Sequence, residues 1–146
     1  MFLFASRASP DEGPGRWFRG ARGARIARIA YALALIGFGL HHFLTTGAAE
    51  AVPAWLPFRP GWVDLTGVAH MAAGVAILVR IVPRLAAILE AIMISAFVLL
   101  VHVPGVIAAP EDRLQWTMLL DASALCGAAW IVAHSMRGGL FTRDQT

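Results

Sequence analysis

The sequence has few charged residues and almost no cysteine. Only 14% of its 146 residues are charged and 58% are hydrophobic, whereas soluble domains have roughly 25% charged and about 45–50% apolar residues. Twelve basic and nine acidic residues cannot cover the surface of a small soluble domain, and so much apolar side chain excludes intrinsic disorder. The single cysteine, Cys126, excludes an internal disulfide, a CxxC redox pair and a cysteine-rich metal site. The composition therefore indicates a membrane protein.

What the chain does contain is a set of long apolar stretches. A bilayer core about 30 Å thick is crossed by about 20 helical residues, and the stretches of that length here end at charged residues, proline or glycine. None has the continuous polar face that a helix of a soluble bundle needs. The sequence predicts an all-α polytopic membrane protein, an antiparallel four-helix transmembrane bundle. The predicted spans are residues 26–46, 62–82, 84–103 and 114–134.

The placement of the arginines predicts the topology. Of the twelve basic residues, all arginine, Arg59 and Arg113 lie on one side of the predicted membrane and the rest on the other. Because cytoplasmic loops carry an excess of basic residues, we expect a multi-pass protein of the bacterial cytoplasmic (inner) membrane with both termini in the cytoplasm. The arginines of the N-terminal leader are explained as a topology signal that contacts anionic lipid headgroups. Nucleic acid is therefore disfavoured as a partner.

The same pattern divides the chain into three parts. Residues 1–24 are predicted to be a mobile, Arg-rich cytoplasmic tail because they lack apolar periodicity after the first four positions. Residues 25–135 form the predicted transmembrane domain, and residues 136–146 a second cytoplasmic tail.

The longest segment between predicted spans, residues 47–61, is rich in proline and aromatic residues. It is too rigid for a regular helix and too apolar for a solvated loop. We expect it to lie in the outer headgroup region, where aromatic side chains gather. It would serve there either as a plain interfacial anchor or as a lid over the outer end of the bundle. The residues of such a lid are Pro53, Trp55, Pro57 and Trp62.

Each predicted span carries small residues and a polar group at helical spacing. Small residues let helices approach closely in lipid, so we expect these faces to pack together. The faces are Ala30, Ala34, Gly37 and His41 on the first span, Thr66, His70 and Ala73 on the second, Ala91, Ser95, Val98 and His102 on the third, and Thr117, Asp121, Ala124 and Ala128 on the fourth.

The ionisable residues near or within the spans are the candidate site, because burying one in lipid costs about 2.5 kcal/mol or more. A rise of about 1.5 Å per residue places the candidates at similar depths near the outer boundary, where they would line one pocket. Glu90 falls nearer the cytoplasmic side, where we expect it to reach Arg80 or Arg84. The pocket candidates are His41, His42, Asp64, His70, His102 and Asp121.

Several of these candidates have a plainer alternative. Asp64 would cap a helix start, His102 would be an interfacial imidazole, and His70 would bond locally to Thr66. His41 and His42 are neighbours and diverge by about 100°, and the small-residue face favours His41 as the inward one.

Imidazoles beside carboxylates suit a proton-coupled quinone site, because a quinone takes up protons as it takes up electrons. A haem between His41 and His70 is compatible with their depths but is not otherwise indicated. No HxxxH or HExxH spacing places two ligands on one helical face, so no metal site is predicted.

Short motifs follow one another along residues 25–135 in a recognisable order. They are GFGLHHF, VPAWLPFRPGW, LTGVAHMAAGVAILV and LLVHVPGVIAAPEDRLQWT. In this order they resemble the DoxX-like membrane proteins. The resemblance implies a four-helix membrane bundle related to small subunits of thiosulfate:quinone oxidation and of membrane redox and oxidative-stress systems.

The resemblance also bears on single residues. The family's His-Phe falls on His42-Phe43, which differs from the geometric preference for His41. Its Pro-rich outer loop falls on Pro53, Trp55 and Pro57. Its Gly-x-x-acid motif ends here in His70, where many members have Glu, so a role that needs a carboxylate at that position is not carried over.

Three functions follow as hypotheses. The first is a subunit or quinone-side anchor of a membrane redox system, which makes the chain at most one subunit of an oxidoreductase. The second is a binder or carrier of a small lipophilic molecule that uses the same pocket without electron transfer. The third is a structural partner of another membrane protein, or of a second copy, through small-residue faces that include Gly37 and Gly74. The expected surroundings are the lipid bilayer and a membrane-protein or redox partner.

Overall fold

Helices make up the regular structure of residues 20–136 and 141, the part of the chain that this computed structural model describes. Most of the two predicted tails, residues 1–19, 137–140 and 142–146, lies outside the described residues. The third long helix is continuous but changes its winding, and is therefore named in three pieces. In chain order the elements are α1 (Gly20–Leu44), η2 (Ala48–Ala51), α2 (Arg59–Val79), α3 (Pro83–Phe97), the π-helix η3 (Val98–His102), α4 (Val103–Ala108) and α5 (Arg113–Ser135).

Four helical segments of the described chain are long and apolar enough to cross a membrane, which confirms the predicted all-α four-helix fold. Two ends differ from the prediction. The first helix begins at Gly20, so residues 20–24 are helical and not part of a tail. The third runs on to Ala108 because Pro104 sits in the first turn of α4, where its missing N–H needs no partner. The preceding turn widens to the π-helix.

The helix starts follow local rules. Proline occupies the first turn of α2 and of α3, a position where its fixed φ angle suits a helix. The Asp112 carboxylate accepts a hydrogen bond of 2.8 Å from the Leu114 N–H and thereby caps α5. Asp64, for which capping was the alternative to a pocket role, lies inside α2 and does not cap it, because that helix begins at Arg59.

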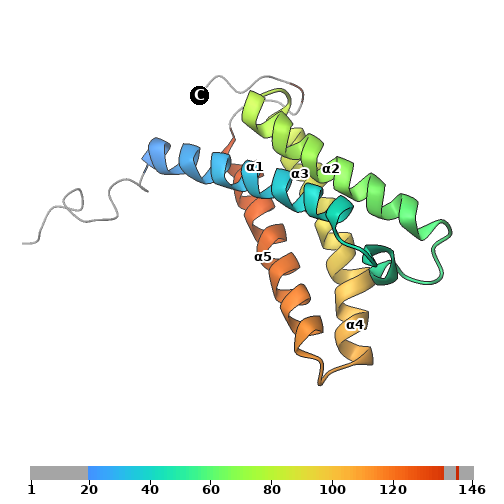
Figure 1. Ribbon diagram of the computed structural model, residues 1–146. Helices are drawn as coiled ribbons and strands as arrows, with labels where there is room; N and C mark the ends of the chain where they lie inside the picture. Colours follow the sequence, from blue (N-terminus) through green and yellow to red (C-terminus); the bar gives the residue numbers. More distant parts are fainter. Residues whose placement is uncertain (1–19, 137–140, 142–146) are drawn as a thin grey trace, which may run out of the picture.

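The helices form two antiparallel pairs, α1 with α2 and α3 with α5 (Figure 1). The α2–α3 turn joins one pair to the other. In Figure 1 the pairs come together near this turn, whereas the start of α2 and the end of α4 lie apart. Contacts between the pairs are therefore made mainly by α2 with α3 and by α1 with α5.

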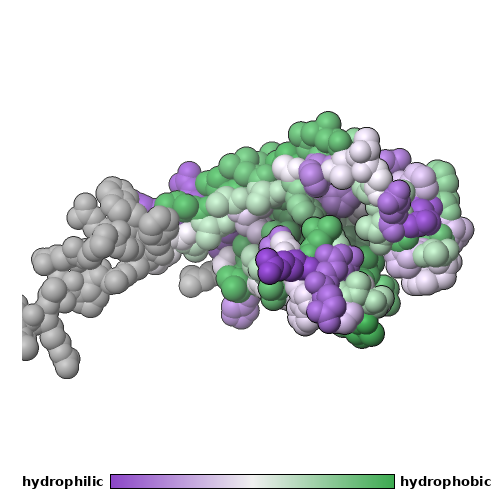
Figure 2. All heavy atoms as spheres, turned by 60° about the horizontal axis from the view of Figure 1, so that its bottom comes forward, coloured by the Kyte–Doolittle hydropathy of each residue, from purple (hydrophilic) through white to green (hydrophobic). Residues whose placement is uncertain are grey.

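Small residues dominate the core between the helices. Alanines on all four long helices are fully or almost fully buried, and bulky apolar side chains point outward, such as Leu89 and Ile131, which are 57% and 71% exposed. Figure 2 shows these hydrophobic residues over the flanks of the helices. Such a surface suits lipid and not water. The core residues are Tyr31, Ala32, Leu35, Ala73, Ile77, Ala87, Ala91, Ala129, Val132, Ala133 and Met136.

Glycines set the contact between α1 and α2. A Cβ added at Gly39 would lie 2.5 Å from the Gly67 carbonyl oxygen, and one at Gly74 would lie 2.6 Å from the Ala32 carbonyl oxygen. The helix backbones therefore touch at positions where no side chain fits, as is common for helices packed in lipid.

The predicted packing face of α1 is wrong. Ala30, Ala34 and Gly37 are exposed, and a Cβ at Gly37 would meet nothing within 4 Å. The helix instead turns Tyr31, Leu35 and Gly39 inward. These residues are also spaced by four, and they combine bulk that fills the core with a glycine that permits close approach.

Candidate functional site

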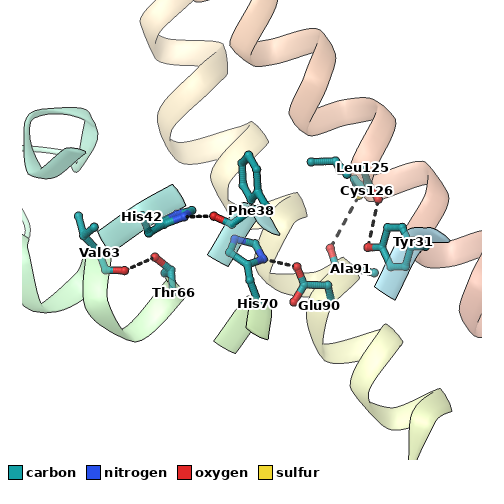
Figure 3. A network of polar contacts seen from close by, with 10 residues as sticks. All are labelled: Tyr31, Phe38, His42, Val63, Thr66, His70, Glu90, Ala91, Leu125 and Cys126. Atoms are coloured by element: carbon teal, nitrogen blue, oxygen red, sulfur yellow. Dashed lines mark hydrogen bonds and ion pairs between the residues drawn. The ribbon is translucent and has the colours of Figure 1, made fainter. Parts of the chain in front are cut away.

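A buried, hydrogen-bonded pair of a histidine and a glutamate joins α2 to α3. His70 and Glu90 are 0% and 2% exposed, and the His70 Nδ1 is hydrogen-bonded to the Glu90 Oε1 (Figure 3). Thr66, His70 and Glu90 are the buried polar residues among those the structure describes. An ionisable pair in this position is costly in lipid and marks the candidate site.

The pair corrects our placement of Glu90 beside Arg80 or Arg84. We had placed the turn at Pro83, but α2 ends at Val79 and the chain turns over residues 80–82. In an antiparallel hairpin, residues equally far from the turn face each other. His70 lies nine residues before the end of α2 at Val79, and Glu90 lies seven residues after the start of α3 at Pro83, so their side chains lie at similar depths and meet.

Two residues of α1 complete the surroundings of His70. Its ring centroid lies 5.1 Å from that of Phe38 in an edge-to-face arrangement and 5.1 Å from that of His42. The His42 Nδ1 donates a hydrogen bond of 2.9 Å to the Phe38 carbonyl oxygen, which holds the second imidazole in place. Figure 3 shows these side chains converging from α1, α2 and α3.

The free nitrogen of His70 is a candidate proton site. Its Nε2 is buried and has no hydrogen-bond partner among the described residues. If Nδ1–H donates to the Glu90 carboxylate, Nε2 carries the lone pair in the neutral ring and an N–H in the protonated ring. The pair can therefore hold one movable proton inside the hydrophobic region.

An apolar groove of about 340 Å³ runs between α2 and α3 and reaches Glu90. Alanines of α2, including Ala69, Ala72 and Ala76, form one wall, and Leu85 and Leu89 belong to the other. Glu90 is the one charged residue that lines this groove. An apolar ligand in the groove would lie beside Glu90, whose side chain is 1% exposed in this structure.

The other histidine candidates lie apart from the pair. His41 is exposed, and its ring is hydrogen-bonded at 3.0 Å to the Thr45 hydroxyl, so the geometric preference for His41 as the inward residue is wrong. His42 occupies the inner position because it follows Gly39 by three residues on the face that packs against α2. His102 lies on the π-helix and has a buried Nδ1 without a hydrogen-bond partner in the described part of the chain.

The acidic candidates do not join the pair either. Asp64 and Asp121 are both exposed. The alternative bond between His70 and Thr66 is also not formed, because the Thr66 hydroxyl donates to the Trp62 and Val63 carbonyl oxygens. Of the six predicted pocket residues, the structure brings together His42 and His70.

The loop between α1 and α2 is held together by its own hydrogen bonds. The Arg59 guanidinium donates to the carbonyl oxygens of Val52 and Glu50 at 2.8 and 2.7 Å, and the Trp62 indole donates to the Pro57 carbonyl oxygen at 3.1 Å. Trp55 is 68% exposed. An exposed tryptophan can insert into the headgroup region, as an interfacial anchor does. The lid formed by Pro53, Trp55, Pro57 and Trp62 stays a prediction.

Metal ligands are not clustered in the described residues: no group of three His, Cys, Asp or Glu side chains there could hold a metal ion. Cys126 is a free thiol within 3.1 Å of the Ser95 hydroxyl.

A family model matches residues 31–120, which is more than half of the chain. The chain belongs to the family of the domain of unknown function DUF8561. The matched DUF8561 region includes Phe38, His42, His70 and Glu90, so the whole candidate site lies within it. No curated protein and no solved structure matches the chain. The likeness of this DUF8561 protein to DoxX-like proteins stays a prediction from its motifs.

Proposed function

We propose that this DUF8561 protein binds a lipophilic quinone in the groove between α2 and α3 and serves as a quinone-side subunit or anchor of a membrane redox system. One observation carries the proposal: the buried His70–Glu90 pair lies at the groove, where Glu90 is the charged lining residue. The resemblance to DoxX-like proteins supports the same class of function.

The chemistry of a quinone fits such a pair. Reduction of a quinone to a quinol takes up two electrons and two protons. The electrons would come from a redox partner protein, Glu90 would deliver one proton to the nearer quinone oxygen, and water would supply the proton of the other oxygen. A His70 imidazolium, protonated from water at Nε2, would return a proton to Glu90 through their hydrogen bond. The isoprenoid tail of the quinone would lie along the alanine wall of α2.

A quinone-binding assay tests the proposal. Purified protein in detergent is heated with and without a short-chain ubiquinone analogue, and its thermal unfolding is followed. A ligand at about 100 times its Kd stabilises the folded state by about 2.7 kcal/mol. We expect this stabilisation for the wild type and for His41→Asn, a matched control on an exposed histidine, and its loss in Glu90→Gln. A wild type that gains no stability would overturn the proposal.

The apolar lining of the groove also favours a carrier of a lipophilic molecule without electron transfer. The His70→Leu/Glu90→Leu double variant separates the two functions, because it removes the proton site, leaves no member of the pair buried without its partner and keeps the groove apolar. A carrier would still be stabilised by the quinone analogue. A redox subunit would lose both this stabilisation and quinone reduction in membranes that contain its partner.

We also propose the bacterial inner membrane as the location, with both termini in the cytoplasm. The start of α1 and the ends of α2 and α5 lie together around Arg25, Arg28 and Arg80. Arg59 and Arg113 begin α2 and α5 at the other ends of those helices. This separation supports the orientation expected from the excess of basic residues in the cytoplasm.

A further inference from the structure

Two adjoining cavities lie at the arginine-rich end of the molecule. One has a volume of about 320 Å³ and the other of about 730 Å³. Arg25, Arg28 and Arg80 line both of them, which brings together guanidinium groups from α1 and from the end of α2. No acidic residue of the described chain lines either cavity.

The smaller cavity is amphipathic. Below its three arginines it is lined by Ile29, Ile77, Leu78 and Pro83. Its ligand should therefore carry negative charge at one end and an apolar chain at the other.

Local structure holds two of the arginines in place. The Arg28 guanidinium donates hydrogen bonds to the hydroxyl and to the carbonyl oxygen of Ser135, which fixes it across α1 and α5. Arg80 ends α2 with φ 59°, and Val82 has φ 43°. A branched residue such as valine rarely adopts a left-handed backbone. Residues with strained backbone angles are often found at ligand sites. Here they allow the chain to turn within three residues, next to Arg80.

We propose that these cavities bind the phosphodiester headgroup of an anionic phospholipid from the adjacent leaflet. Arginine presents a planar fork of donors that matches phosphate oxygens, and basic pockets between transmembrane helices take up acidic headgroups. The acyl chain would pass along Ile29 and Leu78 into the bilayer. This site lies at the start of α1 and does not depend on the quinone proposal.

Lipid retention measured by native mass spectrometry tests the site. The protein is first placed in nanodiscs of phosphatidylcholine that contain about 20% phosphatidylglycerol, an anionic lipid. It is then extracted with detergent, which removes loosely bound lipid. We expect one phosphatidylglycerol molecule to remain bound to the wild type. In the Arg25→Gln/Arg80→Gln double variant, the affinity of the protein for this lipid should fall about thirtyfold, because each arginine near the membrane surface contributes about 1 kcal/mol. Arg59→Gln, the matched control on the outer loop, should keep the lipid.

Further variants and ligands distinguish loss of the lipid site from a folding defect and from a site for free phosphate. Arg25→Lys/Arg80→Lys keeps the charge but not the planar fork of donors, so it should bind the lipid more weakly than the wild type and more tightly than the glutamine double variant. This order separates loss of the site from loss of the fold. Inorganic phosphate alone should not displace the lipid at millimolar concentration. The proposal is overturned if phosphatidylcholine is retained equally, if Arg59→Gln loses as much lipid as the double variant, or if free phosphate binds while the lipid does not.

Discussion

At the scale of single residues, the molecule depends on a histidine and a glutamate that satisfy each other inside a hydrophobic region. His70 and Glu90 are among the most buried residues of the described chain, and Phe38 and His42 lie against the imidazole. A buried charge without its partner is far more costly than the pair itself. Replacing one residue of the pair should therefore lower the stability of the protein more than replacing both.

We expect His70→Leu and Glu90→Leu each to destabilise the protein by about 3–5 kcal/mol, because each leaves a buried ionisable group unpaired. The double variant His70→Leu/Glu90→Leu should be close to the wild type in stability, since two apolar side chains leave nothing unsatisfied. Unfolding in mixed detergent micelles, with all four proteins in one double-mutant cycle, measures this difference. Additive losses in the double variant would show that the two residues act independently.

The sequence could have identified this pair, and it did identify His70. Glu90 was missed because its depth was counted from predicted span ends, whereas the short turn at residues 80–82 sets the register. The choice between His41 and His42 was not open to prediction from spacing alone. Both lie at helical intervals from small residues, and only the contacts of α1 decide which one turns inward.

At the scale of helices, length and hydropathy predicted the spans, but not how each helix is rotated. Gly37 and Gly39 are close in the sequence and lie on different faces of α1, one exposed and one against Gly67. A pattern of small residues in a membrane helix shows where close approach is feasible. It does not show which of two such faces is used.

A leucine in place of a glycine should affect the stability of the protein differently at the α1–α2 contact and on the exposed face of α1. Gly74→Leu should destabilise the monomer by about 1–3 kcal/mol or more, because the side chain would overlap the backbone of α1. Gly37→Leu should leave the stability of the monomer within about 0.5 kcal/mol of the wild type, as surface substitutions do. Thermal unfolding of both variants in the same detergent provides the comparison.

Gly37→Leu also tests the structural-partner hypothesis, now on the exposed face of α1 that carries Ala30 and Ala34. If that face docks another membrane protein or a second copy, the leucine should abolish co-purification or dimer cross-linking while the protein stays folded. Gly74 cannot serve this test, since it lies inside the bundle. Unchanged association in Gly37→Leu would remove this face as the docking surface.

At the scale of the whole molecule, the helices are arranged for lipid, with alanine and glycine inside and bulky apolar side chains outside. Composition together with the lengths of the apolar stretches was enough to predict this fold class. How closely α1 and α2 pack within their pair could not be predicted, because it depends on the backbone contacts made at Gly39, Gly67 and Gly74.

The proposed orientation makes a prediction for the complete chain. Reporter enzymes fused after the C-terminus and within the outer loop near Ala54 should be active on opposite sides of the membrane, with the C-terminal reporter in the cytoplasm. The α4–α5 turn should behave like the outer loop. Reporters that place the C-terminus and the outer loop on one side would contradict four crossings.

The position of the His70–Glu90 bond within the α2–α3 hairpin has a consequence for biogenesis. Both partners belong to neighbouring helices joined by a turn of three residues, so they can find each other as soon as this one hairpin forms. Helices that enter the bilayer one at a time would each expose an ionisable group to acyl chains. The second and third crossings should therefore leave the translocon together, already bonded, before the final helix is synthesised and docks.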